Sequence, residues 1–244
     1  MNLRKTLIEL TGYWIYKLRD LPVGIDLETD LKMKTRQPMR TILDVGANVG
    51  QSAIKFHRYF PEAKIYSLEP VKNTYETLLK NTSHISQVTC ANYALGNSAK
   101  EMNVRVYANE FSSLVTLRED VKLEEEYHYE KIKVTRGDNF CDLHHVQEID
   151  FLKIDTEGFE LDVLDGFSHM FAENKIKMFY CETGFNPVNL RNTYMGKLLD
   201  FAAANRFEFF GLYEVVHTNI KTGYHCGDIL FVHEEIVRKN LRVG

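Results

Sequence analysis

Asp44 and Glu69 are the two acids best placed to hold a nucleoside-like ligand, because each follows an apolar run typical of a buried strand. Between them, residues 44–50 read D-V-G-A-N-V-G, and Gly46 and Gly50 carry no side chain that would keep a ligand from the backbone. A strand, a glycine-rich turn and a helix in this order form the nucleotide-binding unit of α/β proteins, and an acid at the tip of the second strand accepts ribose hydroxyls. These residues predict a nucleoside-cofactor site.

The details of this turn favour S-adenosylmethionine over a dinucleotide. A dinucleotide fingerprint reads G-x-G-x-x-G, whereas Asn48 here replaces the second glycine and Asp44 directly precedes the turn. An aspartate is a poor neighbour for a pyrophosphate, but a good one for a ligand that carries an ammonium and a sulfonium. A NAD-dependent oxidoreductase remains a second enzyme class, and a non-catalytic S-adenosylmethionine-binding subunit or sensor remains a third alternative.

Five segments, the first of which contains this turn, point to one family. They cover residues 42–51, 66–70, 92–96, 111–114 and 151–160, and the most specific of their motifs is K-I-D-T-E-G at 153–158. In this order the segments resemble the FkbM-type S-adenosylmethionine-dependent methyltransferases, over roughly residues 24–235. The resemblance implies a class I methyltransferase (Rossmann-like) fold. It also implies methyl transfer to oxygen, often a hydroxyl of a sugar or a polyketide-type natural product.

Each part of the cofactor has a predicted partner. Asp44 is expected to face the methionine ammonium, directly or through water, and Glu69 the ribose hydroxyls. Asn92, after the third strand, is expected to reach the adenine edge together with backbone near Ala94. Turn and cap chemistry alone is the alternative for Asp44 and Asn48. The predicted cofactor-binding residues are Asp44, Gly46, Ala47, Asn48, Gly50, Glu69, Asn92, Ala94 and Asp155.

The predicted catalytic residues are Asp155, Glu157, Glu182 and His225. The three acids follow the fourth and fifth predicted strands, where ligands bind in open α/β sheets. Methyl transfer needs an aligned nucleophile and an acceptor for its proton, so a carboxylate base or a bound magnesium or manganese ion would help. The alternative is that Asp155, Thr156 and Glu157 cap the following helix. His225, in a predicted loop before the last strand, is a further possible base.

Alternating strands and helices predict an α/β fold: a mainly parallel, seven-stranded sheet with helices on both faces. The expected strands are 41–45, 64–68, 87–93, 150–154, 177–181, 207–213 and 227–232, and expected helices include 52–60 and 192–205. Residues 101–108 and 131–135 predict a β-hairpin inserted between the third and fourth strands. The charge-dense run 118–126 is either a mobile lid over the substrate or a solvated segment without chemistry.

Length and charge indicate one enzyme-sized domain at residues 39–244, preceded by a helical extension at 1–38. The formal net charge of -4 gives no strong field for nucleic acid. A small-molecule or glycan substrate is what the family resemblance implies. The cysteines lie far apart and form no C-x-x-C motif, which favours reduced thiols over a zinc site. They are Cys90, Cys141, Cys181 and Cys226.

The N-terminal residues 3–21 carry an apolar stripe at helical spacing, made of Leu3, Leu7, Leu10, Trp14 and Leu18. Such a helix could lie on a membrane surface, but packing on its own domain or on a second copy in a homo-oligomer is the favoured interpretation. No segment approaches the ~20 apolar residues of a transmembrane helix, and no signal-peptide pattern is present. A cytoplasmic location is therefore expected.

Overall fold

A central seven-stranded sheet organises the protein in the computed structural model, which describes residues 8–13, 16–108, 113–116, 127–187, 192–219 and 223–242. The strand order is β10-β11-β9-β8-β1-β2-β3, and only the pairs β9–β11 and β10–β11 are antiparallel. The predicted mainly parallel, seven-stranded sheet is confirmed. Its strands are β1 (Thr41–Val45), β2 (Lys64–Leu68), β3 (Val88–Ala91), β8 (Phe151–Ile154), β9 (Met178–Gly184), β10 (Phe207–Asn219) and β11 (Gly223–His233).

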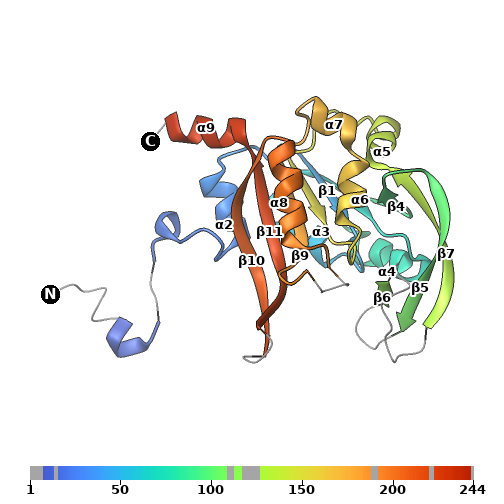
Figure 1. The fold of residues 1–244 in the computed structure, drawn as a ribbon, viewed down its shortest axis with the longest axis horizontal. Helices are drawn as coiled ribbons and strands as arrows, with labels where there is room; N and C mark the ends of the chain where they lie inside the picture. The colour runs from blue at the N-terminus through green and yellow to red at the C-terminus, as the bar shows by residue number, and fades with distance from the viewer. Residues whose placement is uncertain are drawn as a thin grey trace.

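Helices cover both faces of this sheet because its buried strands are apolar on both sides (Figure 1). In β1, Leu43 packs on the layer made of α5, α6, α7 and α8, whereas Ile42 packs on the opposite layer. The first layer consists of α5 (Gly137–Leu143), α6 (Glu160–Asp165), α7 (Ser168–Ala172) and α8 (Met195–Ala204). The opposite layer consists of α2 (Leu27–Thr29), η2 (Asp30–Lys34), α3 (Gln51–Tyr59) and α9 (Glu234–Arg242).

The predicted inserted hairpin is confirmed and belongs to a second sheet of order β4-β7-β5-β6. Its strands are β4 (Ala94–Gly96), β5 (Lys100–Ala108), β6 (Ser113–Thr116) and β7 (Tyr127–Arg136). β5 pairs antiparallel with β7, and the unexpected β4 joins β7 in parallel. This sheet stands beside α4 (Lys72–Thr82), at the β3 side of the main sheet (Figure 1). Val104, Val106 and Ile132 form its buried apolar face.

The N-terminal stripe does not form one helix. The helical residues 8–11 end at Gly12, whose φ is +71°, and the next helical turn is η1 (Leu18–Asp20). Leu10 and Leu18 are 78% and 67% exposed, so these two side chains do not pack on the domain. Leu3, Leu7 and Trp14 lie outside the described residues.

The segment after Gly24 does join the core. Leu27 and Leu31 are buried, and Asp30 accepts hydrogen bonds from the Tyr213 hydroxyl and the Gly24 N–H, both at 2.8 Å. Within the described ranges, no helix combines the length and apolar character needed to cross a bilayer.

Candidate active site

The turn after β1 approaches the end of β8 more closely than a side chain would allow. Gly46, Asn48 and Gly50 have φ of +77°, +48° and +97°, and the Gly46 N–H donates to the carbonyl of Leu68 at the end of β2. A Cβ on Gly46 would lie 1.8 Å from the carbonyl oxygen of Asp155. Glycine is therefore required here for two reasons, its backbone conformation and this contact.

Glu69, directly after β2, closes the other side of this turn. Its carboxylate accepts from the N–H groups of Val71 and Asn48, at 3.0 and 3.1 Å. Burial raises the pKa of Glu69 to about 7, although both hydrogen bonds act to lower it. Asn92 does not line the same cavity as Glu69: its amide donates to the carbonyls of Glu69 and Pro70, and it faces a neighbouring cavity. The Asn92 side chain therefore braces the segment that follows β2, instead of reaching the adenine edge as predicted.

A buried lysine, which the sequence analysis did not single out, lies at the centre of the site. Lys153 pairs with Asp44 in the β1–β8 register, and its Nζ lies 3.3 Å from Asp44 Oδ1 and 3.2 Å from Asp155 Oδ2. It also donates to the Gly46 carbonyl at 3.1 Å. Burial raises the pKa of Asp44 and Lys153 opposes this rise; burial alone would lower the pKa of Lys153, but the two carboxylates raise it. The sequence signal was a lysine within the otherwise apolar run 151–154.

The turn after β8 is organised by Glu160 rather than by the residues predicted to cap the helix. Oε1 of Glu160 accepts from the N–H groups of Thr156 and Gly158 and from the Thr156 hydroxyl, at 3.0 to 3.1 Å. Glu157 and Gly158 have positive φ, so the chain reverses tightly here. Because α6 begins at Glu160 and its N-cap residue is Phe159, neither Asp155 nor Glu157 takes the N-cap position.

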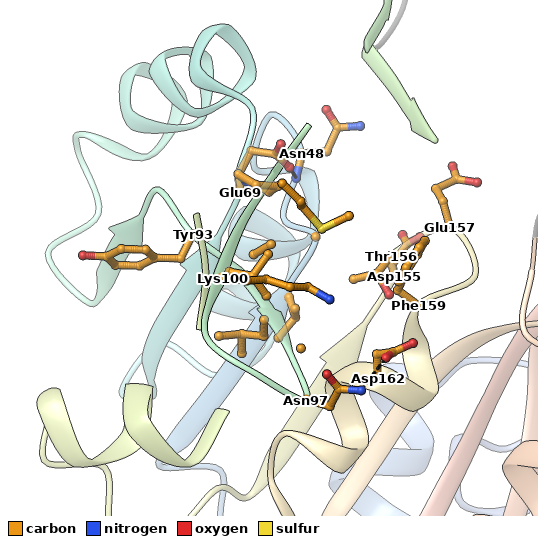
Figure 2. A pocket seen from close by; sticks show the side chains of 18 residues that line it. Asn48, Glu69, Tyr93, Asn97, Lys100, Asp155, Thr156, Glu157, Phe159 and Asp162 are labelled. Carbon is orange, nitrogen blue, oxygen red and sulfur yellow. Dashed lines mark hydrogen bonds between the residues drawn. The ribbon is translucent and has the colours of Figure 1, made fainter. Parts of the chain in front are cut away.

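These segments enclose a cavity between the main sheet and the inserted sheet (Figure 2). Figure 2 shows Lys100 pointing into it from β5, with its ammonium directed towards the turn that carries Asp155 and Thr156. Asn97 donates to Asp162 at 2.8 Å and ties the inserted region to α6. The cavity is lined by Val45, Gly46, Asn48, Glu69, Pro70, Tyr93, Ala94, Leu95, Gly96, Asn97, Lys100, Met102, Val134, Asp155, Thr156, Glu157, Phe159 and Asp162.

The cavity gathers some of the predicted site residues and not others. The predicted residues in its lining are Gly46, Asn48, Glu69, Ala94, Asp155 and Glu157. The predicted residues outside its lining are Asp44, Ala47, Gly50, Asn92 and Glu182. The missed lining residues include Tyr93 and, on β5 and β7, Lys100, Met102 and Val134. Among the described lining side chains, four are carboxylates and one, Lys100, is a cation, so the cavity is acidic.

Glu182 and Asp228 form a second acidic group on the strands beyond β8. They face each other across the antiparallel β9–β11 pair. Burial, together with the carboxylates of Asp155 and Glu157, raises the pKa of Glu182 to about 9. Burial and Asp155 raise the pKa of Asp228 to about 7. Glu182 therefore holds its proton at neutral pH, and Asp228, missed in the sequence, is poised to exchange one.

The predicted acids do not converge as metal ligands. In the part of the chain that the structure describes, no three His, Cys, Asp or Glu side chains are grouped closely enough to hold a metal ion. His225 falls within β11 rather than in a loop, and its side chain lies outside what the structure describes. The predicted lid at 118–126 and residues 111–112 of the family motif also lie outside the described residues.

The sheet order, the glycine turn after β1 and the acid after β2 define a class I methyltransferase fold. Solved structures with a similar fold include TrmK of M. capricolum with S-adenosyl-homocysteine (12% identity, 83% of this chain and 66% of that chain, TM-score 0.47). Another is the magnesium protoporphyrin IX methyltransferase ChlM of Synechocystis PCC 6803 with bound SAM (9% identity, 95% of each chain, TM-score 0.46). Residues 44–209 match the model of the Methyltransferase FkbM domain, and the chain belongs to this family.

Two curated relatives carry methyltransferase names. "Methyltransferase 1" of Beauveria bassiana (strain ARSEF 2860) is 28% identical in an alignment of 142 residues that covers 51% of this chain and 57% of that protein. "Methyltransferase sdnD" of Sordaria araneosa is 29% identical in an alignment of 153 residues that covers 51% of this chain and 59% of that protein. The matches therefore span less than two thirds of either relative's length.

Proposed function

We propose that the protein transfers the methyl group of S-adenosylmethionine to a hydroxyl oxygen of a sugar, a glycan or another polar small molecule. The observation that carries this proposal is the acidic cavity at the ends of β1, β2 and β8. S-adenosylmethionine carries an ammonium, a sulfonium and one carboxylate, so its net charge is positive and complements this lining. The pyrophosphate of a dinucleotide would meet the carboxylate of Asp155 instead, which disfavours a NAD-dependent enzyme.

The cavity offers a partner for each part of the cofactor. Glu69, held by two backbone N–H groups, has the position from which an acid accepts ribose hydroxyls. The apolar side chains of Leu95, Met102 and Val134, beside the backbone of Ala94, offer a surface for adenine. Asp155 lines the cavity with its side chain 43% exposed and is the acid available to the methionine ammonium.

The acceptor site is proposed to lie over β9 and β11, beside Asp155. Transfer forms a carbon–oxygen bond, breaks the carbon–sulfur bond and releases S-adenosylhomocysteine and the hydroxyl proton. Asp228, with a pKa of about 7, has the right proton affinity to take that proton at neutral pH. Glu182, which stays protonated there, can donate a hydrogen bond to a polyhydroxylated acceptor. The family resemblance supports a hydroxyl acceptor, and these polar side chains support a polar one.

Calorimetric titration of the purified protein with S-adenosylhomocysteine, and separately with NAD, tests the cofactor part. We expect micromolar binding of S-adenosylhomocysteine and no heat with NAD; the reverse result would overturn the proposal. Methyl transfer from labelled S-adenosylmethionine to nucleotide-sugars and glycans then tests the acceptor class. Binding without transfer to any hydroxyl compound would favour the non-catalytic S-adenosylmethionine-binding alternative.

A further inference from the structure

Lys153 lies among the fully apolar residues of β8 and is only 7% exposed. Its ammonium has three oxygen partners in the structure: it donates to the Gly46 carbonyl and forms ion pairs with Asp44 and Asp155. These partners come from the end of β1, the turn after β1 and the end of β8. One buried cation therefore connects the two chain segments that form the cofactor side of the cavity.

The two carboxylates on Lys153 differ in what else they can reach. Asp44 has no exposed surface and does not line the cavity, and neither of its carboxylate oxygens has a hydrogen-bond donor among the described residues, so its contact with Lys153 is an ion pair. Asp155 lines the cavity and keeps 43% of its side chain exposed. A ligand in the cavity thus meets Asp155, whereas Asp44 meets the lysine.

We infer that Lys153 is a positioning residue for which Asp44 is the buried counter-ion, so that Asp155, and not Asp44, binds the cofactor's ammonium. This inference rests on the proposed function. Lys153 holds the Gly46 carbonyl and orients the Asp155 carboxylate, and Asp44 balances the charge of the lysine inside the core. Burying Asp44 without the lysine would leave a charge that water cannot solvate, whereas the lysine without Asp44 keeps Asp155 as its counter-charge.

The groups around Asp44 determine how the effect of removing Lys153 depends on pH. The titratable groups that act on Asp44 are Lys153 and Asp155 on and after β8, Glu69 after β2, and Cys90 on β3. Of these only Lys153 is a cation. Without it, the buried carboxylate is surrounded by acids and must take up a proton or move. A lower pH supplies that proton, so the defect should shrink as the pH falls.

The test is a double-mutant cycle with Lys153→Met and Asp44→Asn, read as S-adenosylhomocysteine affinity at pH 6 and pH 8. We expect Lys153→Met to lose at least tenfold in affinity at pH 8 and clearly less at pH 6. The double variant should bind at least tenfold more tightly than Lys153→Met at pH 8, because no unpaired charge remains at position 44. Lys177→Met, which removes a lysine paired with Glu148 at the other end of the sheet, is the matched control.

Two results would overturn the inference. If Asp44 bound the ammonium itself, Asp44→Asn would lose as much affinity as Lys153→Met, and the double variant would bind no better than either. If Lys153 only filled space, the loss in Lys153→Met would be the same at both pH values. Should the wild-type protein bind no S-adenosylhomocysteine, the proposed function fails. The melting temperatures of the wild type, the two single variants and the double variant then still test the pairing of Lys153 with Asp44. This pairing requires that Lys153→Met lowers the melting temperature more at pH 8 than at pH 6, and that the double variant regains part of the loss.

Discussion

The Thr193 hydroxyl donates a hydrogen bond to Oε2 of Glu160, and both side chains are buried. The other oxygen of Glu160 holds the turn after β8, while the Thr193 carbonyl accepts from the Gly184 N–H and the Thr183 hydroxyl at the end of β9. One carboxylate thus connects the turn that carries Asp155 with the end of the next strand. The cofactor side and the proposed acceptor side of the site share this support.

Glu160→Ala is expected to reduce both stability and cofactor binding. The N–H groups of Thr156 and Gly158 and the Thr193 hydroxyl would lose their acceptor in a buried place, which should lower the free energy of unfolding by about 2 to 4 kcal/mol. Urea unfolding measures this change, and Glu62→Ala, at an exposed position, is the control. Equal stability of the two variants would show that the Glu160 hydrogen bonds are dispensable.

Gly46→Ala is expected to remove S-adenosylhomocysteine binding because the new methyl would overlap the Asp155 carbonyl. Gly12 provides a matched control: its φ of +71° is close to that of Gly46, but nothing lies within 4 Å of a Cβ placed there. Calorimetry of both alanine variants separates the contact from the backbone strain. Retained binding in Gly46→Ala would mean that β1 and β8 can separate without harm to the cavity.

Glu69→Gln is expected to weaken S-adenosylhomocysteine binding at pH 8 by about 1.5 kcal/mol, roughly the contribution of a hydrogen bond to a charged group. The wild-type affinity should rise between pH 6 and pH 8, because the carboxylate that accepts the ribose hydroxyls forms as the pH passes its pKa of about 7. The glutamine variant should show no such rise from this group. Calorimetric titrations with S-adenosylhomocysteine at several pH values measure this difference. If the affinities of the two proteins changed with pH in parallel, Glu69 would not bind the ribose.

Glu182→Gln is expected to stabilise the protein at alkaline pH. The folded state keeps the Glu182 proton up to a pKa of about 9, whereas the unfolded chain releases it near 4.5. Wild-type stability from this group is therefore fully present below pH 4.5 and is lost as the pH rises towards 9. In urea unfolding at pH 8, the free energy of unfolding of the variant should exceed that of the wild type by about 1 to 3 kcal/mol. Near pH 4.5 this difference should vanish. A variant less stable than wild type at pH 8 would contradict the assigned proton.

The sequence predicted the main sheet well because its strands are short apolar runs with clear ends. β1 and β2 begin and end where the pattern placed them. The helix expected after β8 is divided into α6 and α7. Gly166, between them, lies close to β4, and a Cβ there would lie 2.3 Å from the Gly96 carbonyl oxygen. β4 itself has only three residues and pairs with β7, which is distant in the sequence, so no periodic pattern indicates it.

The candidate site was predictable where a residue acts through its place in a motif. Gly46, Asn48 and Glu69 belong to the turn and the strand tip, and all three line the cavity. Lys153 and Asp228 were missed because their roles depend on register, which brings Lys153 beside Asp44 and Asp228 beside Glu182. Register between strands distant in sequence is set by packing, and no local pattern reports it.

The parallel pair β4–β7 also has a consequence for the order in which the molecule assembles. Ala94 pairs with Val134, so this contact forms only when a long loop of chain closes, and such closure is entropically slow. Both residues line the cavity. We therefore expect the pocket to be completed late in refolding, after β1 and β2 have paired. S-adenosylhomocysteine added during refolding would then bind and stabilise only the folded protein, and it would not increase the rate of the steps that precede formation of the pocket.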